Sequence, residues 1–120
     1  MIEPPLITFD DDQYMYVYES VESLSMSVEW PFVDEVVGAY DARGFPLRLD
    51  VVNEVVTVDI GVASILDHHR MRALADQFFR LWTYTAAPDP TLATDQYIQE
   101  LLRRYRVAKI RRRKRKSATQ

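Results

Sequence analysis

Two different spacings of apolar residues divide this chain and restrict it to a fold that contains both sheet and helix. Up to about residue 60, short β-branched and aromatic runs alternate with turn-forming residues, as in antiparallel strands. After residue 64, apolar residues recur every three or four positions, as in amphipathic helices. The sequence therefore predicts an α+β domain whose strands come mostly first and whose longer helices come last.

The first two strand-like runs lie at residues 6–9 and 14–18, on either side of the acidic segment 10–13. We expect them to pair as a β-hairpin, because the intervening residues favour a turn. Ser20 is a suitable helix N-cap, since its hydroxyl can accept a hydrogen bond from a free backbone N–H of the first turn. A short helix is therefore expected from there to about residue 30, with one face packed on the sheet.

Three further runs lie at residues 35–40, 46–52 and 55–60 and predict a three-stranded meander. Gly44 lies in the first connection and can adopt the positive φ that such turns require. The second connection, Asn53 and Glu54, is short enough for a tight turn. Hairpin and meander together give an antiparallel sheet of about five strands.

Two longer helices complete the predicted fold. Ser64 and Asp67 match the capping-box pattern, so the first of these helices is expected to begin there. Pro88 and Pro90 must end it, because proline removes a helical donor and clashes with the preceding turn. The apolar residues that share one face are Leu66, Met71, Leu74, Ala75, Phe78, Phe79, Leu81 and Trp82 in this helix, and Ile98, Leu101, Leu102 and Tyr105 in the last one.

Opposite charges are segregated along the chain. Residues 1–100 hold all 18 acidic residues and 5 basic ones, a net charge of −13, whereas residues 101–120 hold the other 10 basic residues and no acid, a net charge of +10. We therefore divide the chain into a single α+β domain at residues 1–105 and a basic tail at residues 106–120, which we expect to be a frayed helix or disordered. This asymmetry indicates electrostatic partners.

Several functional classes have no signature here. The chain has no cysteine, so disulfides and thiolate metal sites are excluded. His68 and His69 are the only histidines, and neighbours on a helix point about 100° apart, which is unfavourable for a shared metal. Phosphate-loop, nucleophile-elbow, HExxH and EF-hand patterns are absent from the sequence. We expect no metal, no cofactor and no catalysis; an enzyme that uses two of the acidic residues is kept as a third alternative.

The cellular location can also be predicted from the sequence. The first residues lack the basic and apolar regions of a secretion signal, and the apolar runs are too short to span a bilayer. The absence of cysteine is compatible with a reducing compartment. We therefore expect a cytoplasmic protein without a transmembrane segment.

Acidic and aromatic residues lie together in two segments and form the first candidate binding surface. The first segment holds three Asp residues at 10–12 and Tyr14, Tyr16 and Tyr18, and the second runs from Glu29 to Glu35. Aromatic side chains supply contact area, whereas carboxylates steer association and pair with Arg or Lys of a partner. The structural alternative is a turn and a solvated rim whose aromatic residues face the core. The residues that we expect on the surface are Asp10, Asp11, Asp12, Glu29, Trp30, Asp34 and Glu35.

The basic tail is the second candidate. It can bind nucleic-acid phosphates through counterion release, or it can contact anionic lipid. A third interpretation is that it folds back on the acidic body, residues 1–100, or simply keeps the protein soluble. The first of these predicts a nucleic-acid-associated protein of a phage or mobile element, which is the alternative to a protein-binding function. The residues involved are Arg103, Arg104, Arg106, Lys109, Arg111, Arg112, Arg113, Lys114, Arg115 and Lys116.

Residues 4–60 resemble a known class of proteins. The segments PPLI at 4–7, YESVE at 18–22 and AYDARGFPLRL at 39–49 look like those of small acidic immunity-type proteins of bacterial polymorphic and contact-dependent toxin systems. The resemblance implies a cytoplasmic inhibitor that binds a cognate protein toxin and occludes its active site. If the toxin is a nuclease, an anionic surface can mimic the phosphate backbone that the toxin binds.

Overall fold

The computed structural model describes residues 1–61 and 65–111, except for the side chains of residues 65–67. It confirms the predicted α+β class. In chain order the elements are β1 (Leu6–Asp10), β2 (Met15–Tyr18), α1 (Val21–Ser27), the 3-10 helix η1 (Trp30–Glu35), β3 (Val36–Tyr40), β4 (Leu47–Val52), β5 (Val55–Ile60), α2 (Ile65–Trp82) and α3 (Thr94–Val107).

The strands of the described residues form two antiparallel sheets. A three-stranded sheet has the order β2-β1-β3, and β4 and β5 form a separate two-stranded sheet. The predicted hairpin of β1 and β2 is confirmed, with Ile7 opposite Val17, and on its other side Ile7 lies opposite Tyr40 of β3. β1 is therefore the central strand of the larger sheet.

The predicted meander is wrong in its first pairing, because β3 pairs with β1 and not with β4. The physical reason is the burial of β1, whose residues Leu6, Ile7, Thr8 and Phe9 are at most 2% exposed. A buried central strand needs a hydrogen-bonding neighbour on both edges, and β2 covers only one of them. An isolated bridge from Tyr40 to Pro46 marks the point where the chain leaves the larger sheet for β4.

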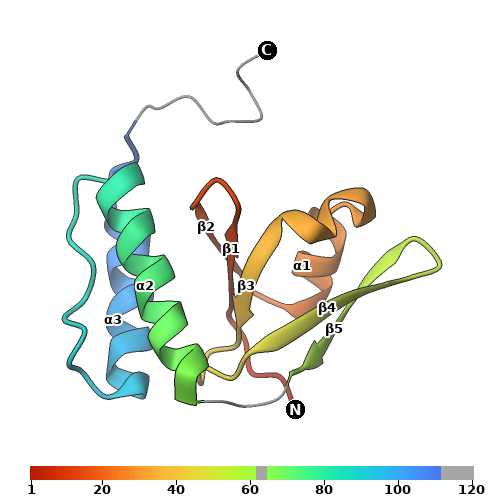
Figure 1. Ribbon diagram of the computed structural model, residues 1–120, viewed down its shortest axis with the longest axis horizontal. Helices are drawn as coiled ribbons and strands as arrows, with labels where there is room; N and C mark the ends of the chain where they lie inside the picture. Colours follow the sequence, from red (N-terminus) through yellow and green to blue (C-terminus); the bar gives the residue numbers. More distant parts are fainter. Residues whose placement is uncertain (62–64, 112–120) are drawn as a thin grey trace.

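The two long helices cover one face of the larger sheet, and α1 with the smaller sheet covers the other. Figure 1 shows α2 and α3 on one side of β1–β3, and α1 with the β4–β5 hairpin on the other. Alternate residues of β1 point to the two sides, as the strand period requires. Ile7 and Phe9 pack in the cluster that contains Phe78 and Leu101 of the two long helices. Leu6 packs in a second cluster, which includes Leu24 of α1 and Val56 of β5.

Local sequence signals are reproduced where the structure describes them. The Ser20 hydroxyl accepts a hydrogen bond of 3.0 Å from the backbone N–H of Ser23 and caps α1 as predicted. Gly44 has the expected positive φ, at 88°, and the β4–β5 turn places Asn53 at φ 52° and Glu54 at 63°. The predicted capping box of Ser64 and Asp67, like the side chain of Leu66, falls outside the described part.

The predicted helix faces are largely buried. In α2, Met71, Ala75, Phe78, Phe79 and Trp82 are buried, and Leu74 and Leu81 are partly buried against the same cluster. In α3, Ile98 and Leu101 are buried, and Leu102 and Tyr105 pack on the cluster. Among the described residues, no helix combines the length and apolar character needed to cross a membrane.

The predicted boundary between residues 105 and 106 lies within α3, which continues to Val107. The chain then turns back along the end of α2. Ile110 forms an antiparallel bridge with Thr83, and the Arg111 backbone N–H donates to the Trp82 carbonyl oxygen at 2.6 Å. The first residues of the predicted tail are thus attached to the body, and residues 112–120 lie outside the described part.

Candidate functional site

A pocket of about 330 Å³ lies between the β1–β2 hairpin and η1. Residues of β1 and β2 reach it from one side because Thr8 and Tyr16 are register partners and point to the same face of the sheet. Its lining residues are Thr8, Asp10, Tyr16, Tyr18, Ser27, Val28, Glu29, Phe32, Glu35 and Val36. We call it the acidic–aromatic pocket, because carboxylates and aromatic rings dominate its wall.

Two tyrosine rings form one wall of the acidic–aromatic pocket. Tyr16 and Tyr18 are stacked with their ring centroids 6.3 Å apart and an interplanar angle of 19°. Burial raises the pKa of Tyr18, a hydrogen bond with the Thr8 side chain opposes this, and the nearby Asp10 carboxylate raises the pKa further. Tyr18 therefore offers a neutral phenol at physiological pH, next to acceptors that carry negative charge.

Asp10 has a structural role in addition to its place in the pocket. Its Oδ1 accepts hydrogen bonds of 3.0 Å from the backbone N–H groups of Asp12 and Tyr14, and its Oδ2 accepts one of 3.2 Å from the Tyr16 hydroxyl. Gln13 completes the turn with a φ of 65°. The carboxylates of Asp10, Asp11 and Asp12 offer oxygens within 4.8 Å of one another, which this turn accounts for without an ion.

The 3-10 helix η1 presents large aromatic side chains to solvent. Trp30 is 43% exposed and Phe32 is 51% exposed, although such residues are usually buried. Glu29 and Glu35 flank them and line the pocket together with Phe32. The Asp11 backbone N–H donates to the Glu35 carbonyl oxygen at 2.9 Å and so holds the acidic turn against the end of η1.

The structure therefore brings most of the predicted acidic surface together. Asp10, Glu29 and Glu35 line one pocket, and the Asp11–Glu35 hydrogen bond places the acidic turn beside it. Asp34 lies elsewhere, in a second pocket of about 310 Å³ that Arg48 also lines. Trp30 is exposed on η1 but is not among the lining residues of the acidic–aromatic pocket.

Three aromatic residues line the pocket but were not placed on the predicted surface: Tyr16 and Tyr18, which belong to the first acidic–aromatic segment, and Phe32. Tyr16 and Tyr18 are two residues apart in β2, and Tyr16 is the register partner of Thr8, so the three side chains lie on one face of the hairpin. This two-residue period is the sequence signal that places both tyrosines on the same face. Phe32 lies in η1. The sequence signal for this short helix is Pro31, because proline is favoured in the first turn of a helix.

The described basic residues are largely engaged with the body. The Arg103 and Arg104 guanidinium groups donate to Glu100 with Nε–O distances of 3.0 and 2.8 Å, and Arg104 also donates to the Ala86 and Ala87 carbonyl oxygens. These hydrogen bonds from Arg103 and then Arg104 lower the pKa of Glu100 to about 2.

The last described arginine is also anchored. Arg111 donates from Nε to the Thr83 carbonyl oxygen at 2.8 Å, and its guanidinium lies 4.8 Å from the centroid of the Tyr84 ring. Arg106 and Lys109 are exposed. The predicted phosphate-binding residues Arg112, Arg113, Lys114, Arg115 and Lys116 lie outside the described part.

The pocket has the chemistry of a cation-binding site. Carboxylates accept charge-assisted hydrogen bonds from Arg or Lys, and aromatic faces attract the same cations.

Comparison of the chain with protein-family models, with curated proteins and with solved structures gave no match.

Proposed function

We propose that this protein is a non-catalytic binding protein that captures a basic protein partner through the acidic–aromatic pocket. The observation that carries the proposal is the joint presence of Glu29, Glu35 and the half-exposed ring of Phe32 around one pocket. A guanidinium fits such a setting, because it stacks on aromatic rings and donates hydrogen bonds to carboxylates in its own plane.

The charge of the body supports the same kind of partner. Residues 1–111 hold 18 acidic and 10 basic residues, a net charge of −8, which attracts a basic surface and speeds diffusional encounter. Trp30 and Phe32 on η1 add apolar contact area beside the acidic residues. Aromatic and arginine side chains are the residues that most often dominate binding energy at protein interfaces.

An immunity-type inhibitor of a bacterial toxin is the specific form of this proposal. Such a protein works in the cytoplasm and blocks the active site of a cognate toxin, and an acidic surface suits a toxin that binds nucleic acid. The resemblance of residues 4–60 and the position of the acidic turn beside an exposed aromatic helix both support it. It requires no cofactor and no catalytic residue.

Binding to the product of the neighbouring gene, which the proposal expects to be a toxin, tests the proposal. Phe32→Ala combined with Glu35→Gln is expected to weaken binding at least about 30-fold, the loss of one interface hot spot. Val55→Ala with Glu54→Gln is the matched control, because it also removes one exposed apolar side chain and one carboxylate but on the β4–β5 hairpin. Equal losses in both variants contradict the proposal.

A nucleic-acid-associated function is the alternative, and the exposure of Arg106 and Lys109 beside the basic stretch 112–116 favours it. Replacing the five basic residues of 112–116 by Gln distinguishes the two. The toxin-inhibitor proposal expects full inhibition from this variant. The nucleic-acid alternative expects the variant to bind double-stranded DNA more weakly than wild type and with a smaller dependence on salt. It also expects that neither wild type nor the variant binds the toxin.

A further inference from the structure

We propose that the basic segment 112–116 of this chain docks in the acidic–aromatic pocket and on the acidic turn 10–12 beside it, so that the C-terminus occupies the pocket in the free protein. This inference goes beyond the function proposed above and does not depend on it, since it concerns the isolated chain. An external basic partner would then have to displace the segment.

The path of the described chain leads to the acidic turn. The Arg111 backbone N–H donates to the carbonyl oxygen of Trp82 at 2.6 Å, and the indole N–H of the same Trp82 donates to the carbonyl oxygen of Asp12 at 3.1 Å. One residue thus contacts both the last described residue and the acidic turn. Two hydrogen bonds and one side chain therefore link Arg111, the residue before segment 112–116, to that turn.

The length of the segment is sufficient for the pocket beyond the turn. An extended chain covers roughly 3.3–3.6 Å per residue, so the five residues 112–116 span up to about 18 Å from Arg111. The pocket adjoins the turn, because Asp10 lines it and the Asp11 backbone N–H donates to Glu35, another lining residue. A segment of this length that passes over the acidic turn therefore comes to the pocket beside it.

Charge complementarity selects this occupant. Residues 112–116 are all Lys or Arg, and such a run is destabilised by its own repulsion unless acidic groups lie near it. Two of the preceding arginines are already engaged, Arg104 with Glu100 and Arg111 with the Thr83 carbonyl oxygen. Because the segment is covalently attached, its effective concentration at the pocket is in the millimolar range, which favours this contact over an equally weak one in trans.

Paramagnetic relaxation enhancement on the full-length protein tests the docking. The chain has no cysteine, so Ser117→Cys provides a unique attachment point for a nitroxide label. At about 0.05 M salt we expect strong broadening of the amide signals of residues 10–12 and 29–35. At about 0.5 M salt we expect most of the signal to return, because screening weakens contacts between exposed charges.

Two double variants locate the contact. Asp11→Asn with Glu35→Gln is expected to reduce the broadening at least threefold. Glu54→Gln with Asp59→Asn removes the same charge from exposed positions of the β4–β5 hairpin and is expected to leave it unchanged. The amide spectrum of each variant without the nitroxide shows whether its fold is intact. A loss of broadening can thus be told apart from a loss of structure.

Three results overturn the inference. Broadening spread evenly over the surface, or centred away from residues 10–12 and 29–35, shows that the segment has no preference for the pocket. Broadening that high salt leaves unchanged shows that charge does not hold it. The third result comes from a mixture in which one copy carries the isotope and another copy carries the nitroxide. If the broadening in this mixture equals that of the doubly labelled protein, the occupant is the segment of a second copy.

Discussion

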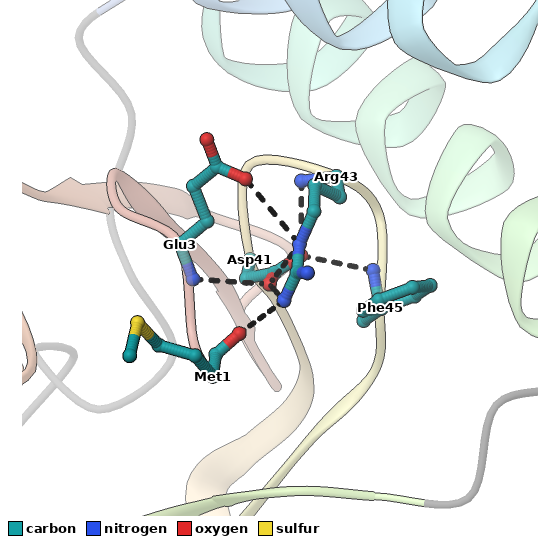
Figure 2. A network of polar contacts seen from close by, with 5 residues as sticks. All are labelled: Met1, Glu3, Asp41, Arg43 and Phe45. Carbon is teal, nitrogen blue, oxygen red and sulfur yellow. Dashed lines mark hydrogen bonds and ion pairs between the residues drawn. The ribbon is translucent and has the colours of Figure 1, made fainter.

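Asp41 accepts a hydrogen bond of 3.2 Å from the backbone N–H of Glu3, a residue 38 positions earlier in the chain. The same carboxylate is fully buried and also accepts from the backbone N–H groups of Arg43 and Phe45 at 2.9 and 3.1 Å. The Arg43 guanidinium pairs with it at 2.8 Å and donates to the Met1 carbonyl oxygen (Figure 2). One side chain therefore ties the N-terminal segment to the loop that follows β3.

Asp41→Ala is expected to lower the free energy of unfolding by about 3 kcal/mol, because it leaves several backbone N–H groups without their acceptor and Arg43 without its partner. Urea unfolding followed by circular dichroism measures this. Asp50→Ala is the control, since Asp50 is 48% exposed and pairs with Arg48 on the surface. It is expected to cost about 0.5 kcal/mol or less, and a similar cost for both variants contradicts the role assigned to Asp41.

The β4–β5 turn contains a residue in an unfavourable conformation. Asn53 and Glu54 have φ values of 52° and 63°, the left-handed region in which an Asn-Gly pair is preferred. Glu54→Gly is expected to raise the free energy of unfolding by about 0.5 kcal/mol, because glycine has no Cβ to strain there. Glu54→Ala removes the same charge but keeps the Cβ, and a gain from this variant in a thermal melt contradicts the explanation.

Local elements could be predicted from the sequence because their determinants are neighbours in the chain. Ser20 caps the helix that begins one residue later, and Gly44 and Asn53 form turns within a few residues. The pairing of β3 could not be predicted in this way. Its apolar pattern is compatible with either β1 or β4 as neighbour, and the choice depends on the two-sided burial of β1 and on the long-range bonds of Asp41.

The candidate site was predictable to a similar extent. The acidic turn followed from consecutive Asp residues, and the structure places it beside Glu35 through a backbone hydrogen bond that no sequence pattern specifies. Phe32 was missed because hydrophobicity alone places a phenylalanine in the core. It lies in η1, none of whose residues is buried.

Glu100 makes the free energy of unfolding depend on pH in the acidic range. Hydrogen bonds from Arg103 and Arg104 hold its pKa at about 2, below the ordinary 4.5. A carboxylate with a depressed pKa in the folded state stabilises that state above pH 4.5, and this contribution is lost as the pH falls to about 2. Glu100→Gln is therefore expected to unfold more easily than wild type near neutral pH and to match it near pH 2.

Urea midpoints across this pH range check the expectation. The difference is expected to shrink in high salt, because the side chains of Glu100 and Arg104 are 25% and 29% exposed and screening reaches them. A pH-independent difference between the two proteins would falsify the ionic origin. Asp95→Asn, in the first turn of the same helix, serves as a control for the loss of one negative charge.

Trp82 is the residue through which α2 supports the acidic turn. It is 4% exposed, its indole N–H donates to the Asp12 carbonyl oxygen at 3.1 Å, and its ring centroid lies 4.9 Å from that of Tyr14. Trp82→Phe keeps an aromatic ring but removes the donor, so we expect a loss of about 1–2 kcal/mol in the free energy of unfolding. Trp30→Phe, on the exposed η1, is expected to change it by less than about 0.5 kcal/mol.

Hydrogen exchange shows where the loss occurs. The Gln13 backbone N–H donates to the Asp10 carbonyl oxygen at 3.0 Å within the acidic turn. Its exchange is expected to accelerate in Trp82→Phe more than that of the Ser23 amide, which donates to the capping Ser20 hydroxyl in α1. This selectivity follows because the indole N–H of α2 donates directly to the turn, whereas α1 packs on the opposite face of the sheet. Uniform acceleration at both amides would mean that Trp82 stabilises the domain as a whole and does not specifically hold the turn.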